Sequence, residues 1–243
     1  MAAKLVANSF GIKGIVPTSM LDWDGHLVTT IFLGGCNLRC PFCHNPSLID
    51  GGDKADIPLE VLFRNFEAKQ GWLDGVCVSG GEPTLSDSLP ELLAYLKDLA
   101  PKVKLDTNGT QPDVLRGLIN EGLVDMVAMD IKTSFKNYAK ATRVGDFTDR
   151  VKESITLLVE AESRGVIAVE FRTTVVPTIV SHDDVIEIAA YLKEVGASRY
   201  YLQQFKPKEV LAAEYSTIKP YDAEFLASLA NEASAFLPTS VRG

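Results

Sequence analysis

Short runs of β-branched and other apolar residues alternate along the chain with longer stretches in which apolar residues recur at helical spacing. Six runs are each followed by an amphipathic stretch, which predicts six β–α units in an α/β fold, with an open parallel sheet and outer helices. Six units are too few to close an eight-stranded barrel, so we expect a partial (βα)6 barrel. The predicted strands cover residues 27–33, 75–79, 103–107, 124–131, 166–176 and 200–205.

The rest of the chain fits around these units as one domain over residues 1–243. Residues 1–26 are expected to form an N-terminal covering segment, in which the glycine-rich residues 9–26 predict a hairpin or a covering stretch. The β–α units fill residues 27–205, and residues 206–243 form a C-terminal segment. Within that segment, residues 222–236 carry the apolar stripe of a helix that packs on a sheet.

Two helix starts have the residues of a capping box. Ser88 is followed three residues later by Glu91, and Ser181 is followed three residues later by Asp184. In each pair we expect the serine to accept from a free backbone amide and the acidic side chain to return the contact.

Composition and charge narrow the class of partner. The chain has 243 residues, 46% of them hydrophobic, and a net charge of −8 without a Lys/Arg-rich stretch. A nucleic-acid surface needs a basic footprint, so we expect no nucleic acid as partner. No apolar run has the length that crosses a bilayer and no leader opens the chain, so we expect a cytoplasmic protein with no membrane partner.

The candidate chemistry begins with the cysteines. Cys36, Cys40 and Cys43 lie in one short loop, and the chain has only one other cysteine, Cys77. Three thiolates on a cubane iron–sulfur cluster leave one iron with open coordination. A zinc site completed by His44 or by the more distant His26 is the alternative, whereas a disulfide framework is disfavoured in a chain of this size.

Polar residues follow strand after strand at the carboxyl end, the edge that carries function in parallel β–α folds. Taken singly, these residues could be turns or a structural ion pair, but together they predict a cofactor site. They are Gly80, Gly81 and Glu82 after the second strand, Asp106 and Asn108 at the third, Asp130 and Lys132 at the fourth, Arg172 in the fifth, and Gln203 and Gln204 in the sixth.

The C-x3-C-x2-C spacing, with Phe42 before the last cysteine, resembles the signature of radical S-adenosylmethionine (SAM) enzymes. His44 and Asn45 narrow the resemblance to the activating enzymes of glycyl radical proteins. The resemblance implies a [4Fe-4S] cluster on the three cysteines and SAM on the open iron. It also implies reductive cleavage of SAM to a 5′-deoxyadenosyl radical, which takes hydrogen from a glycine of a partner enzyme.

The same resemblance assigns roles to the residues at the strand ends. The SAM ammonium would meet Glu82 and the glycine backbone, while Lys132 and Arg172 would meet the carboxylate or ribose. The implied cofactor-binding residues are Phe42, His44, Gly80, Gly81, Glu82, Asp106, Asn108, Lys132, Arg172 and Gln204.

Asp106 and Asp130 have a second implied role. Aspartates at similar positions in pyruvate formate-lyase activating enzyme hold a monovalent cation beside SAM, so Na⁺ or K⁺ is implied here. On general grounds two rim carboxylates need a counter-charge, which a metal, Lys132 or Arg172 can provide.

Residues 22–26 and 203–207 depart from the pattern of pyruvate formate-lyase activases. Residues 21–25 and 202–205 look more like the longer form of anaerobic ribonucleoside-triphosphate reductase activating protein. The expected partners are a glycyl radical enzyme and flavodoxin or ferredoxin as electron donor.

Two alternative functions stay open. One is a small-molecule radical SAM enzyme such as 7-carboxy-7-deazaguanine synthase, and the other is a non-catalytic zinc or iron–sulfur module.

Three residues outside the site are predicted to pack. Cys77 lies in an apolar run and reads as a small buried hydrophobe. Packing is also the favoured role for Trp23 and Trp72.

Overall fold

The computed structural model describes residues 10–243, in which eight strands form one sheet in the order β1 to β8. Strand β1 is antiparallel to β2, whereas β2 to β4 and β6 to β8 pair in parallel. The strands are β1 (Ile12–Ser19), β2 (Val28–Leu33), β3 (Gly75–Gly80), β4 (Val103–Thr107), β5 (Met126–Asp130), β6 (Ala168–Val175), β7 (Tyr200–Gln204) and β8 (Thr239–Arg242).

Helices follow the parallel strands, as the sequence pattern predicts. Among residues 10–243, no helix is both long and apolar enough to cross a bilayer. The α-helices are α2 (Leu59–Ala68), α3 (Leu89–Leu99), α4 (Pro112–Asn120), α5 (Tyr138–Thr142), α6 (Thr148–Ser163), α7 (His182–Glu194) and α8 (Ala223–Ala233). Short 3₁₀ helices are η1 (Pro46–Leu48), η2 (Pro83–Leu85), η3 (Phe135–Asn137) and η4 (Ala213–Thr217).

The six predicted strands coincide with β2 to β7, so the α/β class with a largely parallel sheet and outer helices is confirmed. The segment predicted as a hairpin or covering segment contributes one strand, β1, which pairs antiparallel with β2, so the observed hairpin extends beyond residues 9–26. Residues 1–9 lie outside the described residues. The sequence pattern missed β8. This strand has four residues, three of them polar, so no apolar alternation marks it.

The chain divides into two compact units. The first contains the described residues up to Asn37, together with Ser47–Thr107 and Asp113–Val127. The second contains Leu38–Pro46, Asn108–Pro112 and Ala128–Gly243. The prediction of a single domain over residues 1–243 stays a prediction.

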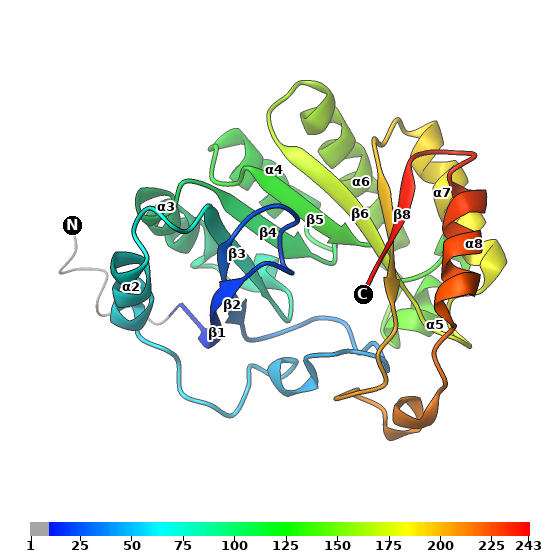
Figure 1. The fold of residues 1–243 in the computed structure, drawn as a ribbon, viewed down its shortest axis with the longest axis horizontal. Helices are drawn as coiled ribbons and strands as arrows, with labels where there is room; N and C mark the ends of the chain where they lie inside the picture. The colour runs from blue at the N-terminus through cyan, green and yellow to red at the C-terminus, as the bar shows by residue number, and fades with distance from the viewer. Residues whose placement is uncertain (1–9) are drawn as a thin grey trace. The chain divides into compact units, whose positions relative to one another are not determined.

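In the first unit, α3 follows β3 along the chain (Figure 1). Its leucines form the apolar stripe that packs the helix beside β4. Leu89, Leu92, Leu93 and Leu96 are fully buried, at the spacing of one helix face. The predicted capping box at this helix is wrong. Ser88 occupies the N-cap position but makes no capping hydrogen bond, because its hydroxyl lies 3.0 Å from that of Ser86.

A small apolar cluster in the first unit contains Trp23, Val28, Cys77 and Met126. The packing roles predicted for Trp23 and Cys77 are therefore confirmed. The prediction for Trp72 is wrong, since its side chain is 77% exposed in the loop after α2.

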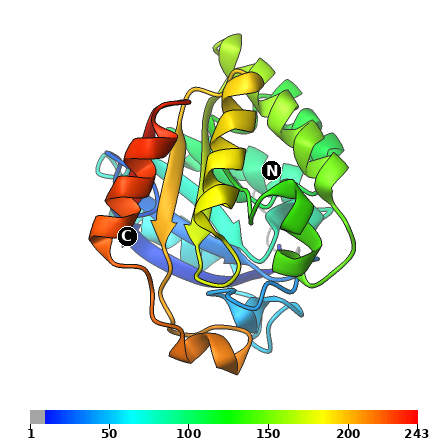
Figure 2. The ribbon, with the colours of Figure 1, turned by 90° about the vertical axis from the view of Figure 1, so that its right-hand side faces the viewer.

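In the second unit, α6, α7 and α8 lie side by side over one face of β6 to β8 (Figure 2). Side chains alternate between the two faces of a strand, and in β6 buried Val169 and Phe171 alternate with Glu170 and Arg172. The apolar set faces the helices, which leaves the polar set on the opposite face of the sheet.

The capping box predicted at α7 is confirmed. Ser181 accepts from the Asp184 amide, and the Asp184 carboxylate accepts from the Ser181 amide at 2.8 Å. Asp184 also accepts from the Ser134 hydroxyl and from Asn137 Nδ2 at 2.8 Å. Burial alone would raise the pKa of Asp184, but these hydrogen bonds outweigh it and hold the pKa below its usual value. One buried carboxylate thus ties the start of α7 to the chain that follows β5.

Replacing Asp184 with Asn should lower the free energy of unfolding by about 1.5–3 kcal/mol near pH 7, since hydrogen bonds to a charged acceptor are lost. Because the folded state lowers the pKa of Asp184, this contribution is complete above the unfolded-state pKa and is lost as the pH falls through the folded-state value. Urea unfolding at pH 7 and at low pH measures the difference. Asp183→Asn, at a side chain 90% exposed on the same turn, is the control and should change little. Equal destabilisation at both pH values would contradict the assignment.

Candidate functional site

The cysteine loop starts in the first unit, where the end of β2 continues into Gly35 and Cys36. The amide of Gly35 donates to the carbonyl of Leu48 at 2.7 Å, and the amide of Cys36 donates to that of Ile49 at 2.9 Å. These two bonds pair the start of the loop with the backbone around η1, which fixes the Cys36 backbone.

The second unit holds the other two cysteines. The amide of Cys43 donates to the carbonyl of Cys40 at 3.0 Å, which closes a tight turn, and the amide of Ala212 donates to the carbonyl of Pro41 at 2.9 Å. Cys40 is buried, Cys36 and Cys43 are half-buried, and none of the three forms a disulfide. Three thiols are the number that a cubane cluster takes from the protein when one iron is left for another ligand, and one short loop of the chain supplies them. Among the described residues, no three His, Cys, Asp or Glu side chains are already arranged around a metal position.

Gly80 and Gly81 lie directly against the chain that leads into the cysteine loop. Gly81 donates to the carbonyl of Leu33 at 3.0 Å, and the Glu82 amide donates to that of Gly35 at 2.8 Å. A β-carbon on Gly81 would lie 2.0 Å from the Gly35 oxygen, and one on Gly80 would lie 2.2 Å from the Leu33 oxygen. Both glycines are therefore needed for the close approach of this backbone to the end of β2 and the start of the cysteine loop.

The carboxylate of Glu82 is buried and held in one orientation. Its Oε1 accepts from the Thr84 amide at 3.1 Å, from the Thr84 hydroxyl, and from the Thr107 hydroxyl at 2.8 Å. Sequence reasoning missed Thr107. Its position at the end of β4, next to the predicted Asp106, is the signal that could have found it.

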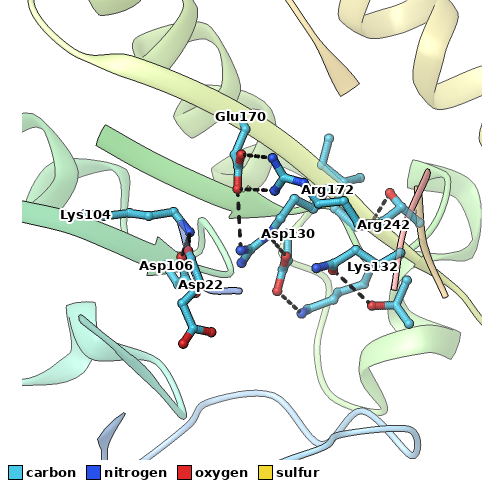
Figure 3. A network of polar contacts seen from close by, with 12 residues as sticks. Asp22, Lys104, Asp106, Asp130, Lys132, Glu170, Arg172 and Arg242 are labelled. Carbon is cyan, nitrogen blue, oxygen red and sulfur yellow. Dashed lines mark hydrogen bonds and ion pairs between the residues drawn. The ribbon is translucent and has the colours of Figure 1, made fainter. Parts of the chain in front are cut away.

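Asp106 forms an ion pair with a lysine that sequence reasoning also missed. The Nζ of Lys104, only 1% exposed, lies 2.9 Å from Asp106 Oδ1 and donates to the carbonyl of Asp22 at 2.6 Å. The Asp22 carboxylate in turn accepts from the Thr30 hydroxyl at 2.6 Å. Figure 3 shows the three charged residues together. Lys104 therefore links the β1–β2 hairpin to a predicted site residue.

Asp130, Lys132 and Arg172 meet within the second unit, as the sequence predicts for a rim of strand ends. Asp130 Oδ1 lies 2.8 Å from Arg172 Nε, and Oδ2 lies 3.1 Å from Lys132 Nζ (Figure 3). Burial would raise the pKa of Asp130, but the two cations outweigh it and hold the pKa well below its usual range. Burial would likewise lower the pKa of Lys132, but Asp130 and, to a smaller extent, Cys40 raise it. All three side chains carry their charges at neutral pH.

His44 is held by the chain that follows β7. Its Nε2 lies 3.1 Å from the Lys206 carbonyl, which can only accept, so the ring donates from Nε2. The ring also stacks on Phe205, with centroids 6.1 Å apart. Its pKa is lowered mainly by loss of hydration, and the charges of Lys132 and Lys206 act in the same direction. Phe42, two residues earlier, is buried.

Asn108 and Gln204 serve local structure. The Asn108 side-chain oxygen accepts from the Thr110 amide at 3.0 Å and from its hydroxyl at 2.8 Å. Gln204 donates to the Tyr221 carbonyl at 3.1 Å, and by strand alternation it lies on the face opposite Arg172. Its neighbour Gln203 lies on the Arg172 face. The cofactor-binding roles of Asn108 and Gln204 stay predictions.

The chain matches the profile of the Radical SAM superfamily over residues 30–192. It belongs to the radical SAM superfamily. Membership makes it an enzyme and implies a [4Fe-4S] cluster and SAM as its cofactors. The donor set described above fits this cluster, and the non-catalytic module is ruled out.

Several proteins are similar to this radical SAM chain. "Putative glycyl-radical enzyme activating enzyme MJ1227" of Methanocaldococcus jannaschii is 34% identical over 208 residues, which are 85% of each chain. A "Probable GTP 3',8-cyclase" of the same organism is 25% identical over 78% of this chain and 62% of its own length. Among solved structures, Streptococcus suis SuiB has a TM-score of 0.65 and 20% identity over 86% of this chain. The match covers 47% of the SuiB chain and confirms the predicted fold class alone.

Gly81→Ala should displace the cysteine loop, because the new methyl group would overlap the Gly35 carbonyl. We expect a loss of about 1–3 kcal/mol in the free energy of unfolding, and less iron bound after anaerobic reconstitution. Gly117→Ala in α4, where a β-carbon meets nothing within 4 Å, is the control and should raise stability by about 0.5–1 kcal/mol. Normal iron loading and stability in Gly81→Ala would refute the steric argument.

Proposed function

We propose that this radical SAM enzyme is an activase that generates a glycyl radical on a partner enzyme. The observation that carries the proposal is the similarity to MJ1227 over 85% of both chains, at 34% identity. The His44–Asn45 pair after the third cysteine supports it, since this pair marks the activating enzymes in the resemblance described above.

Cys36, Cys40 and Cys43 would hold the cluster, and the fourth iron would hold SAM. When bound and reduced by an external donor, the cluster would supply the one electron that splits SAM into methionine and a 5′-deoxyadenosyl radical, which can take hydrogen from a carbon atom. The protein binds and orients SAM for this chemistry. Glu82 would bind the ammonium group of SAM, with Gly80 and Gly81 providing backbone contacts.

Hydrogen bonds and ion pairs hold the side chains of Glu82, Lys132 and Arg172 in position before SAM binds. Thr84 and Thr107 donate hydrogen bonds to Oε1 of Glu82, which restricts the orientation of the whole carboxylate. Asp130 holds Arg172 and Lys132 side by side, and these cations would receive the carboxylate or ribose of SAM. Groups that are already oriented lose less conformational entropy on binding, so SAM is placed at lower cost.

The proposed protein substrate is anaerobic ribonucleoside-triphosphate reductase, with flavodoxin or ferredoxin as electron donor. Residues 22–26 support this choice over pyruvate formate-lyase. A small-molecule function is the second candidate, because relatives named GTP 3',8-cyclase match 78–85% of this chain. The match covers only 62% of the first such relative, whereas 85% of MJ1227 is covered, which favours the activase.

The monovalent cation at Asp106 and Asp130 stays a prediction. Each carboxylate has a cationic partner within 3.1 Å, Lys104 for Asp106 and both Lys132 and Arg172 for Asp130. Titration of SAM binding with KCl, with tetramethylammonium chloride at equal ionic strength as control, tests for this cation.

Anaerobically reconstituted protein, given SAM and a reductant, should form 5′-deoxyadenosine and place a glycyl doublet on the reductase in an electron paramagnetic resonance spectrum. Cys40→Ala should abolish both products because a cluster ligand is lost. Cys77→Ala, at the buried cysteine outside the loop, is the control and should keep both.

Parallel samples contain pyruvate formate-lyase or GTP in place of the reductase. 5′-Deoxyadenosine with no glycyl doublet on either enzyme, together with a cyclised nucleotide from GTP, would contradict the activase proposal.

Thr107→Val should weaken SAM binding about tenfold, because Glu82 loses a hydrogen bond worth about 1.5 kcal/mol. Thr29→Val is the matched control. Thr29 is a buried threonine of the same unit that donates to a backbone carbonyl at 3.1 Å, so its loss should cost stability and leave SAM affinity unchanged. Equal SAM affinity in Thr107→Val and wild type would refute the orienting role of Thr107.

A further inference from the structure

One face of β6, β7 and β8 carries polar side chains at matching positions. Arg172 of β6 pairs in register with Tyr201 of β7, and Tyr201 pairs with Ser240 of β8. Because side chains alternate along each strand, Glu170 and Arg242 lie on the same face as Arg172. This is the face opposite α6 to α8.

Arg242 reaches Glu170 across the intervening strand β7. Its Nη1 lies 2.9 Å from Oε1 and its Nη2 lies 2.9 Å from Oε2, which is a two-pronged pair with a carboxylate only 2% exposed. The guanidinium carbon of Arg242 lies 3.6 Å from the centre of the Tyr201 ring, so the flat group is also supported from one side. Arginine suits this place because its planar fork can bind both oxygens and stack on a ring at once.

Glu170 also lies beside Arg172. The Nη1 of Arg172 is 3.7 Å from Oε1 of Glu170, whereas its Nε is 2.8 Å from Oδ1 of Asp130 (Figure 3). Arg172 therefore stands between two carboxylates and makes its short contact with Asp130. The two short bonds from Arg242 offset the negative charge of Glu170, so its attraction for Arg172 is weakened.

We propose that Arg242 is a positioning residue for the SAM site, acting through Glu170 to keep Arg172 on Asp130. The inference rests on the proposed function, in which Arg172 and Lys132 receive SAM. Without Arg242, the buried charge of Glu170 would have lost a two-pronged partner, and a buried charge that loses its partner is costly. The guanidinium of Arg172 would then turn towards Glu170 and away from Asp130, which also holds Lys132.

The test measures SAM binding by equilibrium dialysis with anaerobically reconstituted protein, together with KM for SAM and kcat for 5′-deoxyadenosine. Arg242→Gln should weaken SAM binding about tenfold and raise KM with a smaller effect on kcat. The double variant Glu170→Gln with Arg242→Gln should return SAM affinity to within about threefold of wild type, since the competing charge is gone. Ser240→Ala, on the same strand and face, is the control and should match wild type.

A residue that only anchors β8 would give a different pattern. In that case the double variant would bind SAM as poorly as Arg242→Gln or worse, and this result overturns the inference. Wild-type affinity in Arg242→Gln overturns it as well. Arg242→Lys, which keeps the charge and one hydrogen bond, should fall between wild type and Arg242→Gln, and it serves if the Gln variant does not fold.

Different results would contradict the activase proposal and the Arg242 inference. Wild-type protein that binds SAM and forms 5′-deoxyadenosine, but makes no glycyl radical on any partner, contradicts the activase and leaves the Arg242 inference supported by its variants. Wild-type protein that binds no SAM overturns both.

Discussion

The backbone of Gly81 lies so close to that of Gly35 that no side chain fits between them. The bonds from the Gly81 amide to Leu33 and from the Glu82 amide to Gly35 join the ends of β3 and β2 at the point where the cysteine loop begins. Cys36 directly follows Gly35 on one side of this contact, and Glu82 directly follows Gly81 on the other. A larger residue at position 81 would therefore disturb a predicted cluster ligand and a predicted SAM ligand together.

Buried ion pairs arrange the other site residues. Lys104 holds Asp106, while Arg172 and Lys132 hold Asp130. Asp130 thus keeps its charge where burial alone would favour the neutral form, because the two cations hold its pKa well below its usual range.

The sequence predicted the elements well because their signals are local. Six strands and the capping box at Ser181 depend on residues within a few positions of one another, and all were confirmed. The cysteine spacing and the glycines at 80 and 81 are equally local signals. The capping box at Ser88 failed because a competing hydroxyl, that of Ser86, lies within hydrogen-bonding distance of the Ser88 hydroxyl.

The residues that the sequence did not reveal act over long separations. Thr107 bonds to Glu82 across 25 positions, and Arg242 bonds to Glu170 across 72. From the sequence alone, a lysine such as Lys104 is expected at the surface, because lysines are rarely buried. Its hydrogen-bond partner, the carbonyl of Asp22, is far away along the chain, so no local pattern predicts the contact. Pairing of distant polar groups is decided by strand register, and register between strands so far apart along the chain is not encoded in a short pattern.

Stability alone does not account for the charged face of β6 to β8. Replacing a buried ion pair with well-packed apolar side chains is often neutral or stabilising, because desolvation of the two charges offsets their attraction. The opposite face of β6 shows that this chain does use apolar packing where helices cover it, with Val169 and Phe171 buried. Buried charges kept in register on the face opposite the helices, each held by a second charge, favour a binding role, because a fixed guanidinium can meet an anionic ligand without first reorganising.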